Sequence, residues 1–219
     1  MIPNKNMARN GMRNLPVRGT KPGAFHDCGP GGLSPEGFGR WYRDEILRCW
    51  ENLDLKSVSR LAGWIEKAEK GGRFVYLMGN GGSAATASHM ATDLAKTAHV
   101  PGRPRVRAVS LNDNMPYVTA VANDLSFGQV FEHQLEGLLD PGDVCVFITG
   151  SGNSPNLVAA AKAARRRGAR TSAFLGFDGG RLKGLVDLPI LIPSVQYGVI
   201  EDLHMGIGHV LAFYLKQRR

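Results

Sequence analysis

The sequence predicts an α/β protein, with a five-stranded parallel sheet flanked by helices and preceded by a helical extension. From residue 74 onwards, short apolar runs alternate with helix-length segments, and most of the runs are nearly continuous in apolar residues. Continuous apolar runs are typical of parallel strands covered on both faces, and right-handed crossovers place helices over the sheet. The expected strands are Phe74–Met78, Val106–Ser110, Val144–Thr149, Thr171–Leu175 and Leu188–Ile192.

The segment before the first strand divides into two parts. Residues 1–34 mix Pro, Gly, Asn and basic residues without hydrophobic periodicity, which predicts a disordered leader. Ser34-Pro35-Glu36 then has the pattern of a helix start, with a capping hydroxyl followed by proline at the first helical position. We expect a single domain over residues 35–219, which includes two helices between residues 35 and 70.

The expected helix boundaries follow from caps and glycines. In the extension they are 35–52 and 55–70, the second capped by Asp54 and ended by Gly71-Gly72. Between and after the strands we expect helices at 84–97, 114–121, 127–138, 155–168 and 199–217.

The composition is that of an ordinary globular protein, with 43% hydrophobic and 21% charged residues. No run of about 18 apolar residues predicts a membrane span. The basic residues of the leader are not followed by an apolar stretch, so the leader does not resemble a secretory signal peptide. We therefore expect a cytoplasmic protein that does not act at a membrane.

The net charge of +8 raises the question of nucleic-acid binding. Residues 1–35 hold five Lys or Arg and one acidic residue, and Arg165-Arg166-Arg167 adds a run on one expected helix. Such runs are usually solvated faces, so a nucleic-acid partner is not expected. The three cysteines lie far apart without CxxC spacing, which predicts neither a disulfide framework nor a thiolate zinc site.

Two loops follow expected strands and lead into expected helices. The first is Gly79-Asn80-Gly81-Gly82-Ser83, and the second is Thr149-Gly150-Ser151-Gly152-Asn153-Ser154. Glycines let a backbone approach an anion, and a helix N-terminus supplies unpaired N–H groups with a favourable dipole. The first loop has neither the lysine of a P-loop nor the spacing of a dinucleotide fingerprint, so neither ATP nor NAD is favoured. Each loop alone could be only a tight turn, but two hydroxyl-rich loops at matching positions favour a phosphate-binding site.

The sequence resembles the sugar isomerase (SIS) domain, and within it the phosphoheptose isomerases. The resemblance rests on these two loops together with Asn123-Asp124, Asp178-Gly179-Gly180 and the segment Glu201–His209. The resemblance covers about residues 36–217. It implies a flavodoxin-like, three-layer α/β sandwich and interconversion of sedoheptulose 7-phosphate with glycero-manno-heptose 7-phosphate. It also implies a homotetramer whose sites are completed by neighbouring subunits. The implied substrate-binding residues are Asn80, Gly81, Gly82, Ser83, Asp124, Thr149, Gly150, Ser151, Ser154 and Glu201.

Aldose–ketose isomerisation requires a base that moves a proton between adjacent carbons, and an acid or a metal that stabilises the enediolate. His89 and Asp93 are four residues apart on one expected helix and point away from its apolar stripe, as Glu201 and His209 do on the last helix. Periodicity alone favours the simpler interpretation that both pairs belong to solvent-exposed polar faces. By the resemblance, His89, Asp93, Glu201 and His209 would be ligands of a divalent metal, most simply zinc.

The resemblance further implies Asp93 as base and His209 as acid, but the sequence departs from the family pattern at several positions. Asp93 stands where the family normally has Glu, and Glu201 where it has Gln, so Glu201 could serve as the base instead. Gly150 replaces a hydroxyl residue of the phosphate loop. Glu201 and His209 are eight residues apart, about 12 Å along a helix, so only a metal between them could join them.

Three other readings stay open. The first is a non-catalytic SIS protein similar to the bacterial replication-initiation factor that binds the initiator ATPase, although those proteins lack the histidine found here as His209. The second is a regulator that senses sugar phosphates, for which no DNA-binding module is visible. The third is an isomerase of another phosphosugar. His204 lies nearer the apolar stripe of its helix and is expected to be structural.

Overall fold

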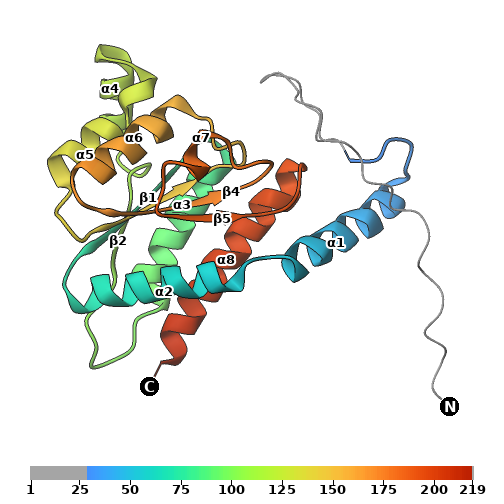
Figure 1. Cartoon of the computed structure of the whole chain (residues 1–219), viewed down its shortest axis with the longest axis horizontal. Coiled ribbons are helices and arrows are strands. Elements are labelled where there is room, and N and C mark those ends of the chain that lie inside the picture. Colours follow the sequence, from blue (N-terminus) through green and yellow to red (C-terminus); the bar gives the residue numbers. More distant parts are fainter. Residues whose placement is uncertain (1–28, 219) are drawn as a thin grey trace.

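The computed structural model describes residues 29–218, and it contains one five-stranded sheet (Figure 1). The strands are β1 (Phe74–Gly79), β2 (Arg107–Ser110), β3 (Val144–Ile148), β4 (Arg170–Leu175) and β5 (Leu188–Leu191). They are all parallel, in the order β2-β1-β3-β4-β5. The predicted α/β fold and all five predicted strands are confirmed. Most of the predicted leader lies outside the described residues.

Two helices precede the sheet, α1 (Pro35–Glu51) and α2 (Leu55–Lys70). Ser34 caps α1 by accepting the Gly37 N–H at 3.1 Å, and Asp54 caps α2 by accepting the N–H groups of Lys56 and Ser57. Both caps satisfy backbone donors that have no partner within the helix. Figure 1 shows α1 extending away from the sheet, whereas α2 lies against it.

The later helices alternate with the strands. They are α3 (Gly82–Thr92), α4 (Met115–Asp124), α5 (Glu132–Leu138), α6 (Pro155–Arg166), α7 (Gly180–Lys183) and α8 (Tyr197–Gln217), with a π-helical turn at Asp93–Thr97 and a 3₁₀ turn at Phe127–Gln129. The π-helical turn and the short α7 were not predicted. Among the described helices, none is long and apolar enough to cross a bilayer.

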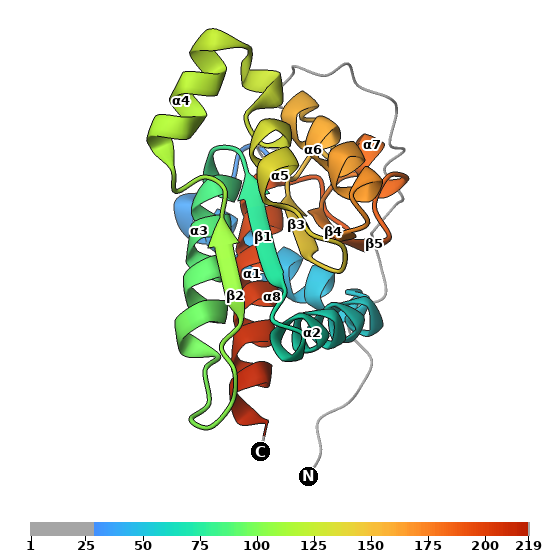
Figure 2. The ribbon, with the colours of Figure 1, turned by 90° about the vertical axis from the view of Figure 1, so that its left-hand side faces the viewer.

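Two hydrophobic clusters cover the two faces of the sheet. On one face, α2, α3 and α8 pack against strand residues such as Val75, Leu77 and Val146. On the other face, α5, α6 and α7 pack against the alternate residues, for example Tyr76 and Cys145. Since successive strand residues point to opposite faces, both sets must be apolar, which explains the continuous apolar runs. Figure 2 shows α3 and α8 side by side, and α4 projecting beyond the ends of the strands.

Candidate functional site

The two glycine-rich loops follow β1 and β3, the neighbouring strands between which the strand order reverses. The chain moves from β1 outward to β2, and from β3 outward to β4 and β5 on the other side. The crevice between the carboxyl ends of β1 and β3 is therefore a topological switch point, where open α/β sheets bind their ligands. The first loop leaves β1 and the second leaves β3, so both predicted phosphate loops lie at this crevice.

The start of the first loop is hydrogen-bonded to an asparagine from a neighbouring segment, which was not predicted from the sequence. The side chain of Asn112, just after β2, donates to the Gly79 carbonyl at 2.9 Å and accepts from the Gly79 N–H at 3.2 Å. Gly81 then adopts a φ of +56°, in the left-handed region that glycine tolerates, and α3 begins at Gly82. The backbone therefore turns sharply from strand to helix.

A pair of side-chain amides joins the two loops. Asn80 of the first loop and Asn156, in the first turn of α6, donate to each other's carbonyl oxygens, both at 2.9 Å. Asn156 is buried, and its oxygen also accepts the Leu157 N–H at 2.9 Å. Buried amide groups that satisfy each other in this way fix the relative position of the segments that carry them. Asn156 was missed because an asparagine near a helix start usually serves as a local cap.

The hydroxyl groups of the second loop surround its glycines. The Thr149 hydroxyl accepts from the Gly152 N–H, and the Ser151 hydroxyl accepts from the Asn153 N–H, both at 3.3 Å. Ser154 stands at the N-cap position of α6 and makes no side-chain capping hydrogen bond. The hydroxyl hydrogens of these residues can therefore be directed to an anion next to the loop.

Three of the four predicted metal ligands lie together on the outer side of α3 and α8. The Nε2 atoms of His89 and His209 are 3.1 Å apart, and the Asp93 Oδ2 atom lies 3.2 Å from His89 Nε2 and 3.7 Å from His209 Nε2. Zinc ligands about 2.0–2.1 Å from a tetrahedral ion are about 3.3 Å from one another. The three distances bracket this value, so the donor set fits a divalent ion with a further coordination position open.

The backbone and a neighbouring hydroxyl orient Asp93. Asp93 begins the π-helical turn, in which the Ala98 N–H bonds the Asp93 carbonyl at 2.8 Å. The Thr97 hydroxyl donates to Asp93 Oδ1 at 2.9 Å, while Oδ2 faces the two imidazoles. Single π-helical turns are frequent at functional sites, and hydrogen bonds to a ligating carboxylate orient it toward the metal.

The structure does not bring Glu201 into this cluster. The ligand atoms of His89, Asp93 and His209 all lie within 4.8 Å of one another, and Glu201 is not part of that group. Its carboxylate lies against the first loop instead, where a Cβ built on Gly82 would be 2.8 Å from each of its oxygens. No described residue donates a hydrogen bond to it, and burial, with the nearby Asp202 charge, raises the pKa of Glu201.

The remaining predicted residues lie apart from the cluster. Asp124 is exposed at the end of α4, and its carboxylate accepts from Asn123 at 2.8 Å. His204 is fully buried against the ring of Phe174, with Nε2 3.3 Å from the Leu175 carbonyl oxygen. Burial lowers the pKa of His204 to about 4, so it stays neutral near pH 7, as expected of a structural histidine.

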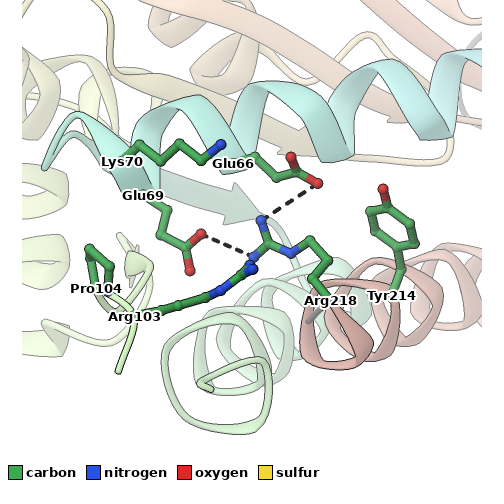
Figure 3. A pocket seen from close by; sticks show the side chains of 7 residues that line it. All are labelled: Glu66, Glu69, Lys70, Arg103, Pro104, Tyr214 and Arg218. Atoms are coloured by element: carbon green, nitrogen blue, oxygen red, sulfur yellow. Dashed lines mark hydrogen bonds and ion pairs between the residues drawn. The ribbon is translucent and has the colours of Figure 1, made fainter. Parts of the chain in front are cut away.

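A cavity of about 420 Å³ lies elsewhere, near the amino ends of the strands (Figure 3). Its walls come from the end of α2, the segment before β2 and the end of α8. The Arg218 guanidinium lies 3.0 Å from Glu69 and 3.5 Å from Glu66 and thereby neutralises the acidic wall. None of the predicted site residues lines this cavity, and its ion pairs attach the end of α8 to α2.

Comparison with known proteins shows which family the chain is similar to. The model of the SIS domain matches residues 41–176. A probable phosphoheptose isomerase of Thermoplasma acidophilum is 36% identical over 178 residues, which cover 81% of this chain and 97% of that protein. A phosphoheptose isomerase of Aquifex aeolicus is 38% identical over 167 residues, which cover 76% of this chain and 87% of that protein.

Solved structures show the same relationship. The phosphoheptose isomerase of Neisseria gonorrhoeae superposes with a TM-score of 0.78 at 27% sequence identity, covering 84% of this chain and 100% of that one. The corresponding enzyme of Francisella tularensis gives a TM-score of 0.77 at 26% identity. The likeness therefore extends over nearly the whole described chain.

Proposed function

The chain belongs to the SIS domain family, among its phosphoheptose isomerases, and we propose that it interconverts sedoheptulose 7-phosphate and D-glycero-D-manno-heptose 7-phosphate. The observation that carries this proposal is the meeting of His89, Asp93 and His209, which share one metal-sized triangle although 120 residues separate the two histidines. Solvent-exposed polar faces, which periodicity alone favoured, do not require such a convergence.

The phosphate of the substrate would bind at the second loop. Thr149, Ser151 and Ser154 provide hydroxyl donors there, and the Asn80–Asn156 pair keeps this loop in place next to the first. The Glu201 carboxylate lies against Gly82 of the first loop. We therefore propose that this loop binds the part of the sugar between the phosphate and the metal cluster, through Asn80, Gly81, Gly82 and Ser83.

Glu201 is the residue that we propose as the base. The Asp93 oxygens face Thr97 on one side and the two imidazoles on the other, whereas no residue among those described donates a hydrogen bond to Glu201. A carboxylate with a raised pKa removes a proton from carbon more effectively near neutral pH. Glu201 would take the proton from C1 of the ketose and return it to C2.

His209 would exchange the hydroxyl proton through Nδ1, because its Nε2 atom faces His89 and Asp93, while the carbonyl moves from C2 to C1. We further propose that His89, Asp93 and His209 hold a divalent ion, with zinc the best match to two imidazoles and one carboxylate. When bound, the ion would supply Lewis-acid stabilisation of negative charge on the substrate oxygens.

We also propose self-association into a homotetramer in the cytoplasm. The His89 and His209 side chains are 49% and 44% exposed, and next to them on α8 the apolar residues Val210 and Phe213 are exposed. A partner subunit covering this face would exclude water from the cluster. A cytoplasmic location agrees with a substrate whose charged phosphate keeps it from crossing membranes.

The direct test incubates purified protein with sedoheptulose 7-phosphate, with and without zinc, and follows aldose formation and the metal content. We expect about one ion per chain, and a fall in turnover of about 100-fold or more for His209→Ala with phosphate binding retained. His133→Ala is the matched control, because His133 lies on α5, over the other face of the sheet, and hydrogen-bonds to the Tyr117 hydroxyl. Absence of turnover in every metal condition, with unchanged sugar binding by His209→Ala, would indicate a non-catalytic SIS protein.

A further inference from the structure

The first residue of α8 packs on the backbone of the second loop. A Cβ built on Gly150 would lie 2.8 Å from Cε1 and 3.0 Å from Cδ1 of the Tyr197 ring. Real Cβ atoms do not approach this closely, so the ring occupies the space that any side chain at position 150 needs. Gly150 and the Tyr197 ring are therefore sterically matched, and a larger residue at position 150 would require the ring to move.

A second aromatic ring supports the first. The Phe177 ring packs on Tyr197 with centroids 4.9 Å apart and an angle of 63° between the planes, an edge-to-face arrangement. Phe177 has a φ of +51° and is the single non-glycine residue with positive φ among residues 29–218. The Phe177 N–H donates to the Ser194 carbonyl at 2.9 Å, and the N–H of the preceding Gly176 donates to the Gly150 carbonyl at 2.8 Å. A strained backbone held by its surroundings at a ligand-binding edge suggests a functional constraint.

The position of these rings relative to the proposed site follows from α8. Tyr197 and Glu201 are one helical turn apart, and they abut the glycines of the second and first loop respectively. A ligand that extends from the phosphate loop toward Glu201 therefore passes along the side of α8 that begins with the Tyr197 ring. Apolar ring surface there can cover carbon atoms of the ligand, which a free phosphate lacks.

We propose that Tyr197, backed by Phe177, is a specificity-determining residue that selects phosphate esters of sugars over inorganic phosphate. The two rings form an aromatic wall beside the second loop, and the carbon atoms next to the phosphate pack against it. Gly150 offers the ligand no side chain, and the wall supplies apolar contact to the sugar at this position. This assignment rests on the proposed function, because it requires the phosphate to bind at the second loop.

The test compares binding of two ligands, sedoheptulose 7-phosphate and inorganic phosphate, measured by calorimetry with the full chain. In Tyr197→Ala we expect affinity for the sugar phosphate to fall about tenfold, with less than about a twofold change for inorganic phosphate. Tyr197→Phe should retain both affinities, since the ring rather than the hydroxyl makes the contact. Val195→Ala, an exposed neighbour before α8, is the control and should also retain both.

A second pair of variants tests the steric relationship. Gly150→Ser should weaken binding of both ligands, because its Cβ meets the Tyr197 ring, and adding Tyr197→Ala should restore inorganic phosphate binding. Equal losses for both ligands in Tyr197→Ala would overturn the proposal and leave the ring a structural role only. So would a wild-type protein that does not prefer sugar phosphate to inorganic phosphate. Preferential sugar phosphate binding without turnover would instead contradict the proposed isomerase activity and leave the wall supported.

Discussion

At the scale of single residues, the side chain of Asn156 decides how the two loops are placed. Its oxygen accepts two hydrogen bonds and its nitrogen donates to Asn80, all at 2.9 Å. We expect Asn156→Ala to lower the free energy of unfolding by about 1–3 kcal/mol, because it leaves the Asn80 amide without its partner. It should also raise KM for the sugar phosphate more than it lowers kcat, because the phosphate loop loses its support.

The double variant Asn80→Ala/Asn156→Ala distinguishes coupling from simple damage. Residues that satisfy each other should give a loss smaller than the sum of the two single losses. Urea denaturation of the four proteins supplies the free energies. Strictly additive losses would show that the amide pair does not join the loops.

Another single residue, His204, makes stability depend on pH. Its pKa is about 4 in the folded protein because of burial, and about 6.5 in the unfolded chain. The unfolded state therefore binds more protons between these values, so the stabilisation present above pH 6.5 is lost as the pH falls toward 4. The loss attributable to His204 should approach about 3 kcal/mol. Denaturation at pH 7.5 and 4.5 measures it, and His204→Phe should show a smaller decrease; identical decreases would contradict the assignment.

At the scale of elements, the helix changes from α-helical to π-helical hydrogen bonding at Asp93, one of the proposed metal ligands. The sequence predicted one helix over residues 84–97, and the structure ends α3 at Thr92 and continues with a π-helical turn. A change from i→i+4 to i→i+5 hydrogen bonding over one turn leaves the pattern of apolar residues the same as in an ordinary helix. Hydrophobic periodicity therefore could not predict the π-helical turn. Within this turn the Thr97 hydroxyl donates to the Asp93 carboxylate.

The Thr97 hydroxyl should therefore control metal affinity. Thr97→Val keeps the shape of the side chain and removes the donor to Asp93 Oδ1, so we expect zinc affinity to fall about tenfold. Thr92→Val is a matched control, since the Thr92 hydroxyl bonds the Ser88 carbonyl and not Asp93. Competition with a zinc-binding dye measures both. An unchanged affinity in Thr97→Val, or an equal loss in Thr92→Val, would exclude this orienting role.

At the scale of the whole molecule, the sheet and the places of the two loops were predictable from sequence. Parallel strands buried on both faces leave a strong apolar signal, and the loops sit where the strand order requires. The contacts between segments far apart in sequence were not predictable. These contacts depend on side-chain packing that no local sequence pattern records. They join Asn80 to Asn156, Tyr197 to Gly150, and Glu201 to Gly82.

The same limit applies to Glu201, which the sequence predicts as a metal ligand and also as an alternative base. On α8, Glu201 and His209 are separated by about 12 Å along the axis, and packing of α8 on α3 sets each beside a different part of that helix. Glu201 lies at its first residue, Gly82, and His209 at His89, two turns further along. The role of Glu201 as a metal ligand stays a prediction, and its role as the base is a proposal supported by its place against Gly82.

Self-association can be tested through the exposed apolar face of α8. The Phe213 side chain lies one helical turn beyond His209 and is 55% exposed, so a partner subunit covering the metal cluster would also cover it. We expect wild-type protein to have the mass of four chains in light scattering, and Phe213→Glu to shift it toward smaller species because burying an unpaired charge is unfavourable. Activity should fall with the tetramer fraction. Leu138→Glu, at a similarly exposed position on α5 in the opposite layer, should leave both unchanged. A monomeric wild type with full activity would show that each subunit completes its own site, and that the exposure of His89 and His209 serves substrate entry instead.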